Sequence, residues 1–431
     1  MIEITDIASL NESEREEIIC RMKVEFRDIE PVVRNIIDAV RNRRSEAVSE
    51  FVKKYDKADL SSFRVTEEEV SRAIKSAPQD IVSNLTKAAD NIFKFQRRQM
   101  PSEFRIESKS GVLGQKIVPL GRVGVYAPGG TAIYPSSVLM GCIPAKVAGV
   151  PEIVLCTPPR ADGTIDESMI VAADLAGASE IYKIGGVPAI AAMAYGIEEM
   201  FPVDKIVGPG NKFVTAAKKI VSADCDIEFL AGPSEILVIA DDTADAEMIS
   251  LDMLAQMEHD ADAEAVLVSL SRKFAEEISS KIGELWKDMP RSEIIGQAIM
   301  RGCRILVAES MEEAVDFAND YAPEHLTIAV MDPESAMRNI CNAGSIFLGN
   351  WSSVAYGDYC AGPNHVLPTM GLAERRGALS PSDFIKAIPY QKTSKRGAAK
   401  LSPIASAIAR AEGLESHAKA AESRVRKLER G

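Results

Sequence analysis

The chain has 431 residues; 46% of them are hydrophobic, 26% are charged, and only four are histidines. This length excludes a single small core, because chains beyond about 250 to 300 residues split into domains, and the ordinary globular composition excludes a disordered or collagen-like protein. The formal net charge of −13 argues against a nucleic-acid partner.

The first hundred residues predict amphipathic helices. Apolar residues recur at helical spacing over residues 32–40, and a second such stretch covers residues 81–95. We therefore expect residues 1–114 to form a helical N-terminal region that packs on the body of the protein. Residues 1–21 are charged and no run reaches eighteen apolar residues, so we expect no membrane segment and a cytoplasmic location.

Residues 115–228 alternate short β-rich runs, glycine turns and helical stretches. The expected strands cover residues 123–126, 153–156, 181–184 and 205–207. The expected helices cover residues 136–148, 167–176, 186–193 and 212–221. Repetition of strand, turn and helix is typical of a parallel sheet with helical crossovers. We predict a first α/β domain here, Rossmann-like but incomplete.

A second series of the same kind covers residues 229–378 and predicts a second incomplete Rossmann-like α/β domain. Its expected strands cover residues 236–239, 265–270, 304–307, 326–329 and 345–348. Its expected helices cover residues 244–257, 273–286 and 311–317. Residues 379–431 predict a helical C-terminal tail that begins at Ser380-Pro381-Ser382-Asp383. The tail is basic, since ten Lys or Arg outnumber four Asp or Glu from Gln391 onward.

Three glycine turns follow expected strands, at residues 128–130, 185–186 and 208–210. Such turns bring backbone N–H groups and helix N-termini to one edge of a sheet, which suits phosphate groups. None matches Gly-x-Gly-x-x-Gly, and the nearest, which begins at Gly208, ends in Phe213. Two hypotheses stay open: a nucleotide site of non-standard type, or tight turns that need glycine for their backbone alone.

The histidines lie beside other polar residues. Gln256 and His259 are three apart on an expected helix and share a face. Glu324 and His325 lie on a loop before a strand, and the other two pairs are Asp358 with His365 and Glu412 with His417. These nitrogen and oxygen donors suit zinc, and also manganese or cobalt. For any single histidine, a structural role remains the alternative.

The seven cysteines are scattered and include no Cys-x-x-Cys pair, which argues against a disulfide framework and against a four-thiolate zinc site. A catalytic thiolate is the less favoured hypothesis, with Cys360 in a polar loop as its candidate.

Several motifs in order along the chain resemble the histidinol dehydrogenase family, from about residue 30 to residue 425. They are Gly121-Arg122-Val123-Gly124-Val125-Tyr126, Val207-Gly208-Pro209-Gly210-Asn211, Ala231-Gly232-Pro233-Ser234-Glu235, residues 256–259, Ala322-Pro323-Glu324-His325-Leu326, residues 357–368 and residues 412–417. The number and order of these motifs make the resemblance specific.

The resemblance implies a zinc-dependent, four-electron oxidation of L-histidinol to L-histidine through L-histidinaldehyde, with two NAD⁺, as the last step of histidine biosynthesis. It implies that one zinc ion per subunit is held by residues matching Gln256, His259, Asp358 and His417. It also implies that His325 accepts the alcohol proton and that Glu324 activates water.

Further positions follow from the same resemblance. Ser234 and Glu412 match positions that bind the substrate, together with His325 and the four metal ligands, and Tyr126 and Asn211 match positions that bind NAD⁺. Pro188 stands where the family usually has a glutamine that contacts NAD⁺. Because proline cannot donate a hydrogen bond, we expect NAD⁺ to be held there by backbone groups.

The resemblance also implies a homodimer in which the C-terminal tail reaches the partner's active site. Two rival hypotheses remain at this point. One is a metallohydrolase, since zinc with Glu and His also activates water. The other is a non-catalytic relative that binds NAD⁺ or an imidazole ligand, which the complete Glu324–His325 pair argues against.

Overall fold

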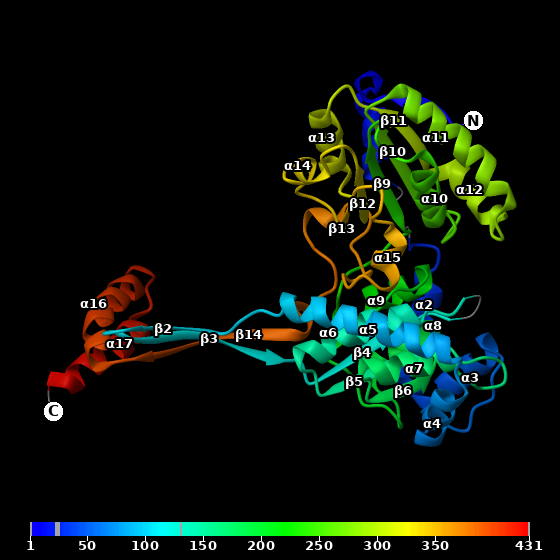
Figure 1. Cartoon of the computed structure of the whole chain (residues 1–431). Helices are drawn as coiled ribbons and strands as arrows, with labels where there is room; N and C mark the ends of the chain where they lie inside the picture. The colour runs from blue at the N-terminus through cyan, green and yellow to red at the C-terminus, as the bar shows by residue number, and fades with distance from the viewer. Residues whose placement is uncertain (1, 22–25, 130–131, 430–431) are drawn as a thin grey trace. The chain divides into compact units, whose positions relative to one another are not determined.

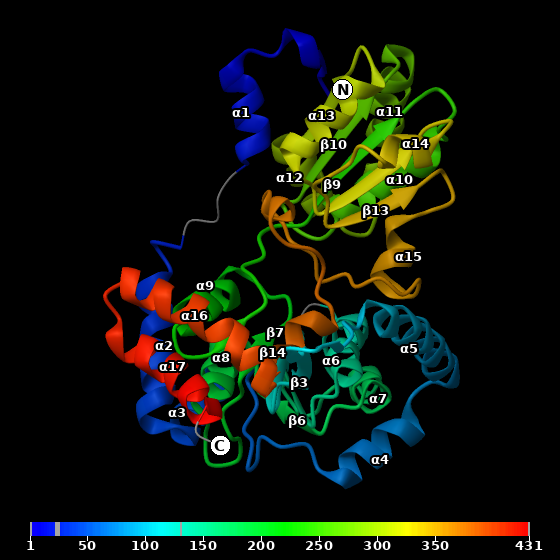
Figure 2. The same ribbon diagram turned by 90° about the vertical axis from the view of Figure 1, so that its left-hand side faces the viewer.

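The computed structural model describes residues 2–21, 26–129 and 132–429, and the chain divides into two compact units (Figures 1 and 2). Unit 1 comprises Met1–Gln99 and Gly121–Phe384, and unit 2 comprises Met100–Leu120 and Ile385–Gly431. Unit 1 contains two parallel sheets, and unit 2 contains a small antiparallel sheet and two helices.

The first sheet of unit 1 is parallel, with strand order β6-β5-β4-β7-β8. Its strands are β4 (Arg122–Tyr126), β5 (Glu152–Thr157), β6 (Glu180–Lys183), β7 (Lys205–Val207) and β8 (Asp226–Ile227). The connecting helices are α6 (Pro135–Ala148), α7 (Glu167–Ala176), α8 (Gly186–Tyr195) and α9 (Lys212–Val221). Almost every residue of the central strands is buried, as a sheet covered by helices on both faces requires.

Helices from the N-terminal region complete the layers around this sheet. They are α2 (Glu30–Arg43), α3 (Ser45–Tyr55), α4 (Glu67–Ser76) and α5 (Gln79–Gln99). Helix α2 packs against α8 and α9, whereas α4 and α5 pack against α7. The apolar stripe of α2, centred on Val33, Ile37 and Val40, is fully buried in the core, as its helical spacing predicts.

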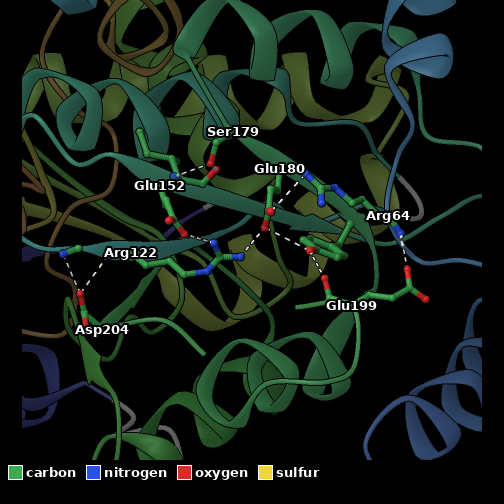
Figure 3. Close-up of polar contacts among 10 residues, drawn as sticks. Arg64, Arg122, Glu152, Ser179, Glu180, Glu199 and Asp204 are labelled. Carbon is green, nitrogen blue, oxygen red and sulfur yellow. Dashed lines mark hydrogen bonds and ion pairs between the residues drawn. The ribbon is translucent and has the colours of Figure 1, made fainter. Parts of the chain in front are cut away.

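The amino-terminal edge of the first sheet carries a network of charges (Figure 3). Arg122, the first residue of β4, forms ion pairs with Glu152 and Glu180, the first residues of the adjacent strand β5 and of the next strand, β6. Asp204 accepts hydrogen bonds from the backbone N–H groups of Gly121 and Arg122, at 2.8 and 3.0 Å. This network fixes strand register at one edge and leaves the opposite, carboxyl edge to the glycine turns.

The second sheet of unit 1 is also parallel, with strand order β1-β11-β10-β9-β12-β13. Its strands are β1 (Ile4–Asp6), β9 (Glu235–Ala240), β10 (Glu264–Ser269), β11 (Cys303–Val307), β12 (His325–Ala329) and β13 (Ser345–Leu348). Its helices include α10 (Ala246–Met257), α11 (Arg272–Leu285), α12 (Ser292–Gly302), α13 (Met311–Tyr321), α14 (Pro333–Met337) and α15 (Val354–Tyr359). A further helix, α1 (Glu12–Cys20), packs against α13.

The two parallel sheets of unit 1 have the same strand order. Apart from the edge strand β1, each runs third-second-first-fourth-fifth in chain order, which is the order of a Rossmann-like half. The expectation of two incomplete Rossmann-like domains with parallel sheets is confirmed. The three-residue strand β1 is an addition within a region that we expected to be helical, and it is too short to show a periodicity.

Unit 2 is built from strands β14 (Ile385–Thr393), β3 (Gly111–Pro119) and β2 (Phe104–Ser108), paired antiparallel in that order, and from helices α16 (Lys395–Ala411) and α17 (Glu415–Glu429). The tail is thus helical from Lys395, as expected, but a strand precedes the helices. Ser380–Asp383 does not start a helix that continues, because a 3₁₀ turn over Pro381–Phe384 leads directly into β14. No helix in the described ranges is both long and apolar enough to cross a membrane.

Candidate functional site

Glu324 and His325 lie where β12 begins in the second sheet. Ala322, with φ of 46°, ends α13, and Pro323 prevents the helix from continuing, so the chain turns directly into the strand. Both side chains are buried, and Nδ1 of His325 lies 3.5 Å from Oε2 of Glu324. Sequence placed this pair before the strand, whereas the structure makes His325 its first residue.

The two ring nitrogens of His325 have different surroundings. Nδ1 lies 3.1 Å from the backbone carbonyl oxygen of Glu235, so a proton on Nδ1 satisfies that contact. Nε2 is buried and forms no hydrogen bond within the described structure, and it lies 3.4 Å from Oδ1 of Asp358. Burial lowers the pKa of His325, but the carboxylates of Glu324 and Asp358 outweigh it and raise the pKa well above its usual value.

The expected metal ligands of unit 1 lie on two neighbouring helices. Gln256 is buried in the last turn of α10, and His259 is exposed just past the end of that helix. Asp358 lies in α15, and the hydrogen bond from Ser353 to Asp252, at 2.7 Å, ties the two helices together. The imidazoles of His325, His365 and His259 help to hold the pKa of Asp358 below its usual value, against the effect of burial. Asp358 therefore remains a carboxylate, as a metal ligand must.

No group of three or more His, Cys, Asp or Glu side chains in the described ranges is arranged to hold a metal ion. The expected ligand set is consistent with this finding, because it includes only two such residues from unit 1, His259 and Asp358, together with the amide of Gln256. The fourth member, His417, belongs to unit 2. The donors are nitrogen and oxygen atoms without thiolate, which suits zinc, and also manganese or cobalt.

His365 supports the segment that carries Asp358. Its Nδ1 lies 2.8 Å from the backbone oxygen of Asp358, and its Nε2 lies 3.5 Å from Oγ of Ser137 in α6. The side chain is therefore engaged with the backbone of Asp358 and not with its carboxylate. Ser234, expected to bind substrate, immediately precedes β9 and is partly exposed.

The residues expected to bind NAD⁺ gather at the carboxyl edge of the first sheet. Tyr126 ends β4, and its buried hydroxyl accepts a hydrogen bond from the N–H of Gly186, at 3.1 Å. Burial raises the pKa of this hydroxyl to about 12, so it stays neutral.

The glycine turn after β7 lies close to the end of β4. Gly208, at φ of 123°, approaches so closely that a Cβ atom on it would lie 2.0 Å from the backbone oxygen of Tyr126. Gly130, the last residue of the first glycine turn, lies outside the described residues.

Two further NAD⁺ candidates begin helices at this edge. Asn211 is the N-cap of α9, and its side-chain oxygen accepts from the N–H groups of Phe213 and Val214. Pro188 is buried in the first turn of α8, where a helix tolerates proline because that N–H has no acceptor within the helix. The turns after β4 and β7 flank the point where the strand order reverses, which is where such folds bind nucleotides.

We expect Pro188→Gln to lower the KM for NAD⁺ by about fivefold, the effect of about 1 kcal/mol from one added hydrogen bond. The measurement is initial rate against NAD⁺ concentration at saturating second substrate. Pro188→Ala is the matched control, because it removes the ring without adding an amide and should leave KM unchanged. An unchanged KM in Pro188→Gln would show that the missing side chain is unimportant.

Asp56 lies beside the same edge, where a Cβ on Gly185 would come within 3.3 Å of its Oδ1. Burial raises the pKa of Asp56 to about 6, compared with about 3.9 in an unfolded chain. The folded state therefore binds this proton more tightly, and stability falls as pH rises from about 4 through about 6. We expect Asp56→Asn to raise the free energy of unfolding by about 1 kcal/mol at pH 8, after allowing for partial exposure, and to change it little at pH 4.

Urea denaturation at the two pH values measures this difference. Asp59→Asn is the control, because Asp59 pairs with Lys53 on the surface with both side chains largely exposed, and its removal should matter little at either pH. Equal effects of Asp56→Asn at pH 4 and pH 8 would contradict the burial of a charged carboxylate.

Glu412 and His417 lie in unit 2 at the junction of its two helices. Gly413, at φ of 77°, ends α16, and α17 begins at Glu415, so the glycine breaks the helix as expected. Both Glu412 and His417 are exposed. On an unbroken helix, residues five positions apart point in different directions. The turn at Gly413 interrupts the helix, so Glu412 and His417 are not held to that geometry.

Sequence reasoning missed one residue that contacts the Glu324–His325 pair and a second residue that lies behind it. Glu235, the first residue of β9, hydrogen-bonds to both members of the pair, and Arg21 forms a buried ion pair with Glu235. The position of Glu235 directly after Ser234, an expected substrate-binding residue, was a signal that could have found it. Arg21 gave no signal, because it lies 214 positions away in a charged helical stretch.

The chain is similar to known proteins over nearly its whole length. The family model described as histidinol dehydrogenase matches residues 20–425. The chain is 47% identical over 411 residues to the histidinol dehydrogenase of Methanothermobacter thermautotrophicus, covering 95% of this chain and 96% of the relative. It is 44% identical over 425 residues to that of Methanocaldococcus jannaschii, covering 98% and 99%. The crystal structure of histidinol dehydrogenase from Elizabethkingia anophelis superposes with a TM-score of 0.95 at 37% identity, covering 99% of this chain and 98% of that one.

Proposed function

The chain belongs to the histidinol dehydrogenase family and is an oxidoreductase of histidine biosynthesis, and we propose that it oxidises L-histidinol to L-histidine through L-histidinaldehyde with two NAD⁺ and one zinc ion per subunit. The observation that carries this proposal is the environment of His325. Its Nε2 is buried, forms no hydrogen bond within the described structure, and faces Asp358 at 3.4 Å. A buried polar atom without a partner is costly unless a ligand satisfies it, and a substrate hydroxyl is such a partner.

We assign the metal to Gln256, His259 and Asp358 of one subunit and His417 of another. The thiolate-free set of imidazole, carboxylate and amide donors supports zinc. Zinc, when bound, is a template that holds the imidazole and amine of histidinol beside the catalytic pair. Ser234 and Glu412 are the additional residues that we assign to substrate binding.

We assign His325 as the base that takes the proton from the substrate hydroxyl in the first oxidation. The contact of Nδ1 with the carbonyl of Glu235 leaves Nε2 as the nitrogen that takes the proton. A metal ion on Asp358 would neutralise one of the two carboxylates that raise the pKa of His325, which favours the neutral imidazole that a base requires. We assign Glu324 as the base that takes a proton from the water that attacks the aldehyde, and His325 as the base again when the resulting hydrate is oxidised. One oxygen of Glu324, Oε2, accepts from the N–H of Glu235 at 2.8 Å, which leaves Oε1 for that water.

We place NAD⁺ at the carboxyl edge of the first sheet, with Tyr126 and Asn211 beside it and Pro188 in the first turn of α8. NAD⁺, when bound, accepts one hydride in each of the two oxidations. The N-termini of α8 and α9 and the N–H groups of the glycine turns supply the positive ends that suit its phosphates.

We propose that the enzyme is a cytoplasmic homodimer in which unit 2 carries Glu412 and His417 to the partner's site. Unit 2 exposes many large apolar side chains, and such exposure favours an interaction surface. On the strands they are Phe104, Ile106, Leu113, Ile388 and Tyr390, and on the helices Leu401, Ile404, Ile408 and Leu414.

The test is absorbance at 340 nm after L-histidinol and NAD⁺ are mixed with the protein, together with chromatography of the product. We expect two NADH per histidinol and histidine as the product. A metallohydrolase, the rival enzyme class, would produce no NADH from these reactants.

A further inference from the structure

A buried ion pair lies directly behind the catalytic pair. Nε and Nη2 of Arg21 lie 2.8 and 2.9 Å from Oε2 and Oε1 of Glu235, and the two side chains are only 4% and 2% exposed. The guanidinium also lies over the ring of Tyr321, 3.4 Å from its centre, and the Tyr321 hydroxyl donates to Glu264 at 2.9 Å. The ion pair, with a hydrogen bond from Nη2 to Oε1, and the stacking on Tyr321 hold the Arg21 side chain from two sides.

Three polar groups of Glu235 contact the Glu324–His325 segment. Its carboxylate Oε1 accepts from the N–H of Glu324 at 3.1 Å, its N–H donates to Oε2 of Glu324 at 2.8 Å, and its carbonyl lies 3.1 Å from Nδ1 of His325. The same Oε1 accepts from the N–H of Met370 at 3.1 Å. Glu235 therefore determines which oxygen of Glu324 is free and which nitrogen of His325 faces the substrate.

A carboxylate in this position needs a counter-charge. Burial, together with the nearby carboxylates of Glu324 and Glu264, raises the pKa of Glu235 to about 8 even though the Arg21 guanidinium acts against that rise. The carboxyl group accepts two backbone N–H groups and the guanidinium at once, so Arg21 stabilises the charged form in which all three contacts are satisfied.

We propose that Arg21 and Glu235 are positioning residues for the oxidation, which orient Glu324 and His325 without touching the substrate. This inference rests on the proposed function, because it assigns the pair to the same reaction. A misplacement of a catalytic group by a fraction of an ångström lowers the rate and leaves binding of zinc and substrate intact.

The test uses three variants of the full-length enzyme: Arg21→Gln, Arg21→Lys and Glu235→Gln. We expect kcat for histidinol to fall about ten- to a hundredfold in Arg21→Gln and Glu235→Gln, with zinc content and the KM for histidinol within about twofold of wild type. Arg21→Lys should recover part of kcat, because lysine keeps the positive charge. The recovery should be only partial, because lysine lacks the planar guanidinium and its stacking on Tyr321.

Arg15→Gln is a matched control on the same helix. Arg15 pairs with Asp320 at 2.7 Å and lies over the ring of Phe317, so it repeats the pattern of Arg21 at the surface. We expect its kcat to equal that of wild type, because the pair is largely exposed and does not touch the catalytic residues.

The double variant Arg21→Met with Glu235→Gln covers the case in which a single change unfolds the protein, because it leaves no buried charge. We expect it to fold, to keep zinc, and to lose about as much kcat as either single variant, since the two residues act as one unit. Folded, zinc-loaded variants with wild-type kcat would overturn the inference. Variants that keep wild-type kcat but lose zinc, or that have a strongly raised KM for histidinol, would also overturn it. Absence of histidinol turnover in wild type measured alongside would instead overturn the proposed function.

Discussion

Replacing His325 with asparagine is expected to lower kcat for histidinol by about 10²- to 10⁴-fold, the usual contribution of a general base. Asparagine can still donate a hydrogen bond to the carbonyl of Glu235 but cannot accept a proton at the position of Nε2. Zinc content and the KM for histidinol should stay close to wild type, because His325 is not among the residues assigned to the metal.

Metal analysis of the purified variant and steady-state kinetics at saturating NAD⁺ measure the two effects separately. Loss of zinc in His325→Asn would show that its role is misassigned and that it holds the metal. Full turnover with zinc retained would remove it from the mechanism. Glu324→Gln is the companion variant, and histidinaldehyde should accumulate there, because the assigned role of Glu324 belongs to the second oxidation.

The second large effect is recovery of activity from two inactive variants. Co-expression of His325→Asn with His417→Ala is expected to restore about a quarter of wild-type activity, although each variant alone is inactive. Heterodimers form half of the population, and each contains one site that combines an intact His325 from one subunit with an intact His417 from the other. The activity of the mixed population against a wild-type standard gives the measurement.

The matched control is co-expression of His325→Asn with Glu324→Gln. Both changes lie in unit 1, so neither subunit can supply an intact catalytic pair and formation of histidine should not return. If His417 served the site of its own chain, co-expression with His417→Ala would also fail, and the assignment of unit 2 to the partner's site would be wrong.

The two parallel sheets could be predicted because their strands are short, buried and separated by glycine turns. The small sheet of unit 2 could not. Its strand β14 contains Pro389, which argues against a strand in sequence reasoning, yet β14 is an edge strand and tolerates proline. Strand β2 alternates Phe104, Arg105 and Ile106, but its apolar face is exposed in the chain, so no core of its own specifies it.

The candidate site also contains residues that could be predicted from the sequence and residues that could not. Motifs indicated Glu324, His325 and the metal ligands because each is a chemically special residue in a short run. The pairing of His365 with Asp358 in the sequence becomes a contact with the backbone of Asp358, not with its carboxylate. Arg21 could not be found, because an arginine in a charged stretch has no local pattern, and only the folded chain brings it to Glu235.

The most direct test of the proposed chemistry is histidinol turnover before and after removal of zinc. We predict that the enzyme as purified yields two NADH and one histidine per histidinol. After exhaustive chelation and removal of the chelator, turnover should fall below detection, and one equivalent of zinc per subunit should restore it. Undiminished turnover in protein shown by metal analysis to be free of zinc and other divalent ions would contradict the account.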